Sequence, residues 1–310
     1  MRLLHRCLAA AYIIFVCIYN NGWAWDARPA DLEEAFLLWA SPKAEYAGTS
    51  QLDAWTLLTA DTAATARVIP KFLGTPSGAV REKILMFCEN ADAASVGPAF
   101  RPHAVPDSPQ LGLVLFCLSR AGDTESLPII LEHLSSRRWQ VRSAAALSLG
   151  YLGRDARAAV PDLIRALSDT APMVRKSAAY ALGQCADSGT VTLTVVEALV
   201  RALDDDFFGT RFNAARALAL LGDSALAMLA ARYDGLSDTA RYGVLLTLGR
   251  AEGAAGRPML EKISADTAAV MPLRGIALKG LLDRKWAPAD TDLAELRATD
   301  VGRGLWGMTR

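Results

Sequence analysis

A segment that returns about every 33 residues constrains the fold of this chain more than any other sequence feature. Val141–Gly150 aligns with Val174–Gly183, with an arginine, a run of small residues and a final Leu-Gly at matching places. Further copies begin near Gln110, Thr210, Thr239 and Leu273, and a weaker copy begins at Val80. Repetition at this period is typical of arrays in which each unit buries its apolar face against its neighbours.

Each copy is followed by a second amphipathic segment, so the repeating unit is a pair of helices. In Val160–Leu167, apolar residues recur at three- and four-residue spacing and share one helix face. Glycine can take the left-handed conformation that ends a helix, and the junctions contain Gly122, Gly153 and Gly222. Aromatic residues make up only 7% of the chain while alanine is abundant, which favours packed helices over sandwiches or barrels. The sequence predicts an all-α fold, an α-solenoid of about eight stacked helical hairpins.

The first helix of each pair carries small residues that let adjacent backbones approach closely. Examples are Ala144–Ala146, Ala178 and Ala214. We expect the seam between layers to be filled by Leu149, Leu182, Leu218 and Leu248.

The stretch Ala159–Gly183 resembles the HEAT repeat, an armadillo-like unit, especially the short form named after phycobilisome bilin lyases. The resemblance is specific over about residues 110–285. In that family an aspartate in the turn before a repeat and an arginine at its start form a hydrogen-bonded ladder, and Asp169 with Arg175, and Asp205 with Arg211, match it. Arg142 follows Ser136-Arg137-Arg138 and lacks the upstream aspartate, so we expect the ladder to be interrupted there. The resemblance implies a binding scaffold.

The ends of the chain divide it further. Residues 1–24 contain Arg2 and Arg6, an apolar run too short to cross a bilayer, and small residues at Gly22 and Ala24. We therefore expect a signal peptide cleaved after Ala24 and an exported protein, periplasmic or secreted, with an uncleaved membrane anchor as the rival interpretation. N-terminal capping helices with Trp39 and Trp55 are expected over 25–79, the repeat array over 80–285 and a C-terminal cap and tail over 286–310. The prolines of 91–109 predict an irregular insert with a short helix and a loop.

Charge and motifs exclude several function classes. The 33 basic and 33 acidic residues balance, which disfavours a nucleic-acid binder. Only three histidines are present, and no nucleophile elbow, phosphate-binding loop or Cys/His cluster occurs, so we expect no enzyme, no metal and no cofactor. His103 is interpreted as a surface residue. Cys88, Cys117 and Cys185 are expected to be buried thiols, with a Cys88–Cys117 disulfide left open.

The favoured function is an exported scaffold that binds proteins through its concave surface and assembles or stabilises an envelope or extracellular complex. Equivalent positions of the second helices predict one charged ridge on that surface, made of Lys71, Glu132, Arg165 and Arg201. Phe207 and Phe208 follow three aspartates and either anchor a partner or pack under the next repeat. The alternatives are a bilin-lyase-like, tetrapyrrole-binding chaperone and an accessory subunit of an enzyme.

Overall fold

The computed structural model describes residues 29, 31–41, 49–186, 193–252 and 254–286. These residues are helical, with no strand among them, so the predicted all-α fold is confirmed. They belong to two compact units, and the boundary lies between Asp61 and Thr62. None of the helices in the described ranges combines the length and the apolar character needed to cross a membrane.

The first unit contains a pair of helices, α2 (Leu32–Ala40) and α3 (Thr49–Ala60). Asp31 begins α2 by accepting a hydrogen bond from the Glu34 N–H at 2.8 Å. The rings of Trp39 and Trp55 stack with their centroids 4.5 Å apart, and Trp39 is buried. The two tryptophans therefore hold α2 and α3 together; the role of these helices as a cap stays a prediction.

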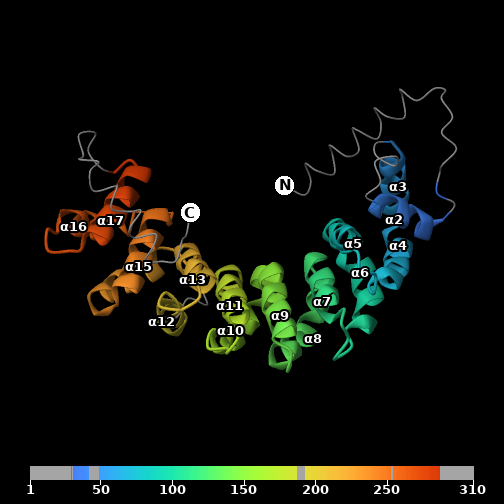
Figure 1. The fold of residues 1–310 in the computed structure, drawn as a ribbon, viewed down its shortest axis with the longest axis horizontal. Coiled ribbons are helices and arrows are strands. Elements are labelled where there is room, and N and C mark those ends of the chain that lie inside the picture. The colour runs from blue at the N-terminus through green and yellow to red at the C-terminus, as the bar shows by residue number, and fades with distance from the viewer. Residues whose placement is uncertain (1–28, 30, 42–48, 187–192, 253, 287–310) are drawn as a thin grey trace. The chain divides into compact units, whose positions relative to one another are not determined.

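The second unit is a stack of helical hairpins in chain order (Figure 1). Its first helices are α5 (Gly78–Asn90), α7 (Leu111–Arg120), α9 (Trp139–Leu152), α11 (Pro172–Cys185), α13 (Phe208–Leu220), α15 (Asp238–Arg250) and α17 (Met271–Asp283). Its second helices are α6 (Ala93–Phe100), α8 (Leu127–Glu132), α10 (Val160–Ala166), α12 (Leu193–Ala202), α14 (Asp223–Ala231) and α16 (Arg257–Ala265). Each first helix contacts the next one along the stack. Short 3₁₀ segments join the helices: η2 (Ile69–Phe72), η3 (Arg101–His103), η4 (Thr124–Ser126), η5 (His133–Ser135), η6 (Gly153–Ala159) and η7 (Tyr233–Gly235).

Three glycines end first helices as the sequence predicts. Gly122, Gly153 and Gly222 have φ values of 75°, 61° and 83°. These values lie in the left-handed region, which glycine adopts without steric cost.

The first helices pack closely because small residues line their contacts. A Cβ atom added to Gly183 would lie 2.8 Å from the Cα of Ala217, and one added to Gly249 would lie 2.8 Å from the Cα of Gly280. The second helices bury larger side chains, such as Leu163 and Leu199. This difference in size brings the first helices together on the inner side of the stack and leaves the second helices on its outer side (Figure 1).

One hydrophobic core runs without a break through the layers from α7 to α17. The four seam leucines, Leu149, Leu182, Leu218 and Leu248, are each no more than 1% exposed, which confirms the prediction. Burial of this kind supplies most of the stability of a helical array.

The proline-rich insert folds around a short helix, as expected, with Pro98 inside α6. Arg101 in η3 fixes the insert to the next hairpin by donating hydrogen bonds to Asp123 at 2.5 and 2.8 Å, and the Asp123 side chain is only 3% exposed. Upstream, α4 (Thr62–Val68) packs on α6. The contacts therefore place α4 and η2 in the second unit, whereas the sequence analysis put them in the capping segment 25–79.

The three described cysteines are buried free thiols, as predicted. Burial and a hydrogen bond with the Cys88 thiol raise the pKa of Cys117. Burial raises the pKa of Cys185 to about 12, and its Sγ donates to the Leu149 carbonyl at 3.3 Å. The Cys117 and Cys185 thiols are therefore protonated at neutral pH. Cys88 and Cys117 are in contact without a disulfide between them.

Candidate functional site

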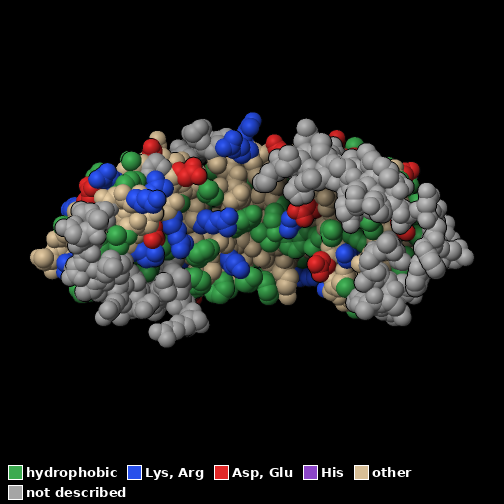
Figure 2. Space-filling model, turned by 90° about the horizontal axis from the view of Figure 1, so that it is seen from above, with side chains coloured by type: hydrophobic (Ala, Val, Ile, Leu, Met, Phe, Trp, Pro, Cys, Tyr) green, Lys and Arg blue, Asp and Glu red, His purple; other side chains and the backbone are tan. Residues whose placement is uncertain are grey.

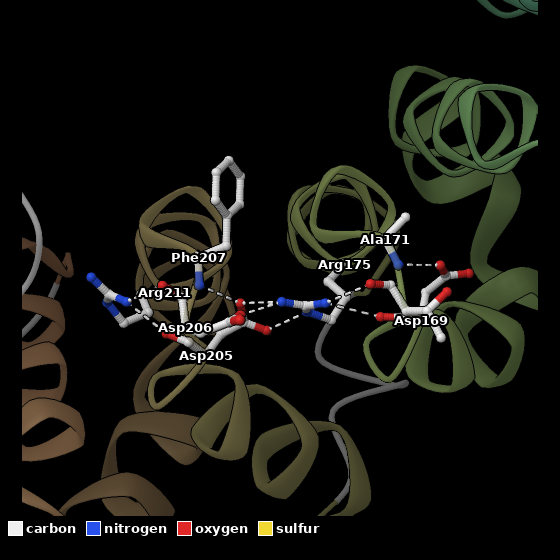
Figure 3. Close-up of polar contacts among 8 residues, drawn as sticks. Asp169, Ala171, Arg175, Asp205, Asp206, Phe207 and Arg211 are labelled. Atoms are coloured by element: carbon white, nitrogen blue, oxygen red, sulfur yellow. Dashed lines mark hydrogen bonds and ion pairs between the residues drawn. The ribbon is translucent and has the colours of Figure 1, made fainter.

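Arginines at the starts of successive first helices form a ladder with the turns on either side of them. Arg142 donates to the Asp169 carboxylate at 2.6 and 2.7 Å and to the Ser136 carbonyl at 2.9 Å. Arg175 repeats the arrangement one layer on, with the Asp205 carboxylate at 2.6 and 3.0 Å and the Asp169 carbonyl at 3.0 Å (Figure 3). Each guanidinium thus ties its own turn to the next turn.

The ladder differs in two respects from the sequence-based expectation. The carboxylate of Asp169 binds the arginine of the preceding layer, Arg142, and only its carbonyl binds Arg175. The expected interruption at Arg142 is therefore wrong, because a backbone carbonyl takes the place of the missing upstream aspartate.

Arg211 contacts its own turn in the same way, by donating to the Asp205 carbonyl at 2.6 Å (Figure 3). In the next turn Gly235 stands where the pattern of Asp169 and Asp205 would place an aspartate. Burial lowers the pKa of Arg211, against the raising effect of nearby aspartates. Hydrogen bonds to aspartate instead raise the pKa values of Arg142 and Arg175. Among the described residues, Asp169 and Asp205 are thus the aspartates at this position of the ladder.

Acid is expected to weaken the array through these carboxylates. Burial raises the pKa values of Asp169 and Asp205, but hydrogen bonds from the arginines and from the N–H groups of Ala171 and Phe207 outweigh it, so both lie below the ordinary 3.8. The unfolded chain therefore binds more protons near that pH. The stabilisation is present above pH 3.8 and is lost as the pH falls through the lowered folded values.

The measurement is the free energy of unfolding in urea between about pH 6 and about pH 3. An Arg175→Met variant should show a shallower loss of stability with acid, because the pKa of Asp205 then returns towards its ordinary value. Identical pH dependence in the two proteins would contradict this account.

A groove of about 820 Å³ lies across the first helices α5, α7, α9, α11 and α13. Its apolar lining includes Leu85, Leu113, Leu147 and Met173, and its polar lining includes Gln110, Gln140, Ser143 and Asn213. Seen from the side of the first helices, hydrophobic and basic side chains lie next to each other on this part of the molecule (Figure 2). The repeated first helices build this groove together.

A row of aromatic rings runs along the groove. Phe116 and Tyr151 meet edge to face with centroids 6.3 Å apart, and Tyr151 and Tyr180 meet in the same way at 6.2 Å. The Arg120 guanidinium lies 4.2 Å from the centre of the Tyr151 ring. Gly150 makes room for the row, because a Cβ atom there would lie 2.8 Å from the Tyr180 ring. The rings are therefore held in place by the scaffold.

The charged side chains that line the groove have one sign. Arg81 and Lys176 are the charged residues among those that line it, and both are basic. Arg120, beside the row, forms an ion pair with Glu89 at 2.9 Å. The groove therefore presents an apolar surface with positive charge.

A family model of HEAT repeats matches residues 127–193 and 160–249. Residues 127–249 are HEAT repeats. The resemblance seen in the sequence is confirmed for these HEAT repeats, which include the ladder and most of α9 to α15.

Solved structures show a similar arrangement of helices at low sequence identity. A chain of the structure of Kap95p with RanGDP matches with a TM-score of 0.50 and 13% identity, over 81% of this chain and 42% of that chain. The CpcE–CpcF complex of phycocyanin lyase from Nostoc sp. PCC7120 matches with a TM-score of 0.36 and 19% identity, over 91% and 98%. The Escherichia coli protein YibA matches with a TM-score of 0.47 and 16% identity, over 87% and 100%. A comparison with curated protein sequences gave no match.

Three residues of the predicted charged ridge, Glu132, Arg165 and Arg201, lie in second helices on the outer side of the stack (Figure 1). Lys71 is in η2, Glu132 in α8, Arg165 in α10 and Arg201 in α12, and all four side chains are exposed. None of them lines the groove. The sequence analysis assigned the concave surface to the second helices, whereas the close packing of small residues puts the first helices there. A role of the ridge in binding stays a prediction.

Phe207 and Phe208 lie at the start of α13 and are both half-buried. The Phe208 ring packs on Phe212 with centroids 5.9 Å apart and touches the hydrophobic core. This favours the packing alternative for Phe208. His103 is exposed in η3, and no group of three or more His, Cys, Asp or Glu among the described residues is placed to hold a metal ion.

The sequence analysis did not identify the groove residues. A pattern was present, because the position five residues after the ladder arginines is large in successive repeats, with Leu147 after Arg142 and Tyr180 after Arg175. Their neighbours in the helix are alanine, glycine or serine, so these bulky residues stand out once the inner side of the array is known.

Proposed function

We propose that this chain is a non-catalytic scaffold that binds other proteins through the groove on its first helices. We propose further that it acts after export, in an envelope or extracellular complex. The observation that carries the proposal is the groove itself, an apolar and aromatic surface shared by five successive helices.

The groove has the features of a binding surface for proteins. Aromatic, Met and Arg side chains are enriched where proteins bind one another, and Trp, Tyr and Arg supply most of the binding energy. At the edge of this groove the exposed fractions of Trp139 and Met173 are 44% and 38%. Exposed apolar side chains grouped in this way are typical of an interaction site.

Photo-crosslinking from the groove tests the proposed function. A photoreactive phenylalanine derivative at Met173 lies at the edge of the groove, and the same group at Arg201 lies on the outer helix α12 as a matched control. We expect a defined protein to be crosslinked from position 173 and not from position 201, with identification by mass spectrometry. Capture from position 201 alone would rule out the groove, and capture from neither position would overturn the scaffold. A visible absorbance band in the purified protein would instead support the tetrapyrrole-binding alternative.

Export is tested separately by N-terminal sequencing. Residues 1–24 lie outside the described residues, and their composition supports a cleaved signal peptide. We expect the protein recovered from outside the cytoplasm to begin at Trp25. A mature chain that keeps Met1 would contradict cleavage.

A further inference from the structure

The groove is long enough to hold an extended peptide. Five adjacent helices separated by about 8–10 Å span roughly 32–40 Å. A chain of about twelve residues at roughly 3.3 Å per residue covers that distance when extended. The lining residues run from Arg81 on α5 to Asn213 on α13, so a ligand that fills the groove crosses several HEAT repeats.

The charged residues in the groove determine which sign of charge the ligand should carry. Arg81 and Lys176 lie among the lining residues, which contain no Asp or Glu. Arg216 is exposed on α13, and its charge acts on Tyr180 in the aromatic row. A ligand with carboxylates thus finds Arg81 and Lys176 in the lining and Arg216 acting on Tyr180, whereas a basic ligand is repelled.

The apolar parts of the groove select a second property of the ligand. Trp139 at the start of α9 and Met173 in the first turn of α11 expose large apolar surfaces at its edge. Tyr180 lines the same groove and contacts Tyr151 of the aromatic row. Side chains with rings or long aliphatic groups bury the most surface against such residues.

We propose that the groove binds an extended acidic segment of a partner protein, in which carboxylate side chains alternate with aromatic or large aliphatic ones. This inference rests on the proposed scaffold function and specifies the chemistry of its partner. The amide side chain of Gln140 lines the groove and can hydrogen-bond to the peptide backbone. A nucleic acid strand carries a phosphate at every nucleotide, which the two cations of the lining do not match.

Fluorescence anisotropy with the full chain and a labelled probe peptide tests the inference. The probe has about twelve residues, enough to span roughly 40 Å, with glutamate and phenylalanine in alternation. Three comparison probes replace every glutamate by lysine, replace every phenylalanine by serine, or substitute a thymidine oligonucleotide of equal charge. We expect the glutamate–phenylalanine peptide to bind at least about tenfold more tightly than the others, with an affinity that falls as salt is added.

Two variants of the protein locate the binding. The double variant Arg81→Glu with Lys176→Glu should bind the acidic peptide at least about tenfold more weakly, and Trp139→Ala should lower the affinity by a similar factor. The control Arg165→Glu reverses a charge on the outer helix α10 and should leave the affinity unchanged. Circular dichroism of each variant shows whether it is folded, and since these side chains are not in the core, unfolding is not expected.

Each outcome decides between the possibilities. Tighter binding of the lysine peptide or of the oligonucleotide overturns the inference, and so does equal weakening by Arg165→Glu. If the acidic peptide does not bind but a protein is crosslinked from position 173, the inference fails and the proposed function stands. If neither occurs, both fail.

Discussion

An Arg175→Met variant is expected to lower the free energy of unfolding by about 3 kcal/mol. The substitution keeps an apolar chain of similar length but removes the guanidinium that binds Asp205 and the Asp169 carbonyl. The Asp205 side chain is only 9% exposed, so water cannot solvate its charge well once the guanidinium is removed. Urea unfolding followed by far-UV circular dichroism measures the change.

Arg165→Ala is the matched control for this prediction. Arg165 also pairs with an aspartate, Asp162, but its side chain is 74% exposed, and such a pair contributes within about 0.5 kcal/mol. The double variant Arg175→Met with Asp205→Leu should recover part of the loss, because no unpaired buried charge remains. Equal stabilities of the Arg175→Met and Arg165→Ala proteins would contradict a stabilising role for the ladder.

A Gly183→Val variant is expected to destabilise the array by about 2–3 kcal/mol through overpacking. The added Cβ atom lies 2.8 Å from the Cα and 2.9 Å from the Cβ of Ala217, so α11 and α13 have to move apart. The same two layers carry the pair Arg175–Asp205, so the substitution should also weaken the ladder. The effect of Gly183→Val and Arg175→Met together should then be smaller than the sum of the single effects.

Gly78→Ala provides the comparison for the glycine. Gly78 begins α5, and a Cβ atom added there meets nothing within 4 Å. Alanine should therefore leave stability unchanged or raise it by up to about 1 kcal/mol, since it is the better helix former. If Gly183→Val unfolds at the same urea concentration as Gly78→Ala, the close contact between α11 and α13 does not limit side-chain size.

The array could be predicted from the sequence because its determinants are local and repeated. The spacing of apolar residues gives the hairpins, Gly122, Gly153 and Gly222 mark the ends of first helices, and the seam leucines are found where the repeat places them. The carboxylate partners in the ladder could not be assigned correctly, because pairing within one turn and pairing with the next layer fit the same spacing. Arg142 shows this most clearly, since its partner Asp169 lies 27 residues further along the chain.

The groove could not be predicted for a related reason. Which helix layer is on the inner side depends on the relative size of the side chains packed within each layer, and this is a property of the whole stack. The sequence analysis used equivalent positions of the second helices and so selected Glu132, Arg165 and Arg201, which lie on the outer side. Trp139 and Lys176 belong to no sequence motif, and only the packing of successive repeats brings them together with Tyr180.

The span of the arginine–aspartate ladder has a consequence for how the protein moves. The ladder fastens α9, α11 and α13 to one another, and in the turn before α15 Gly235 stands in place of the ladder aspartate. In a linear array, each layer is stabilised by its neighbours, so amide hydrogens should exchange most slowly in the fastened centre and faster towards α17. The central layers also carry Trp139 and Tyr180 of the groove. A ligand therefore binds to helices that are already ordered, and binding costs little conformational entropy of the protein.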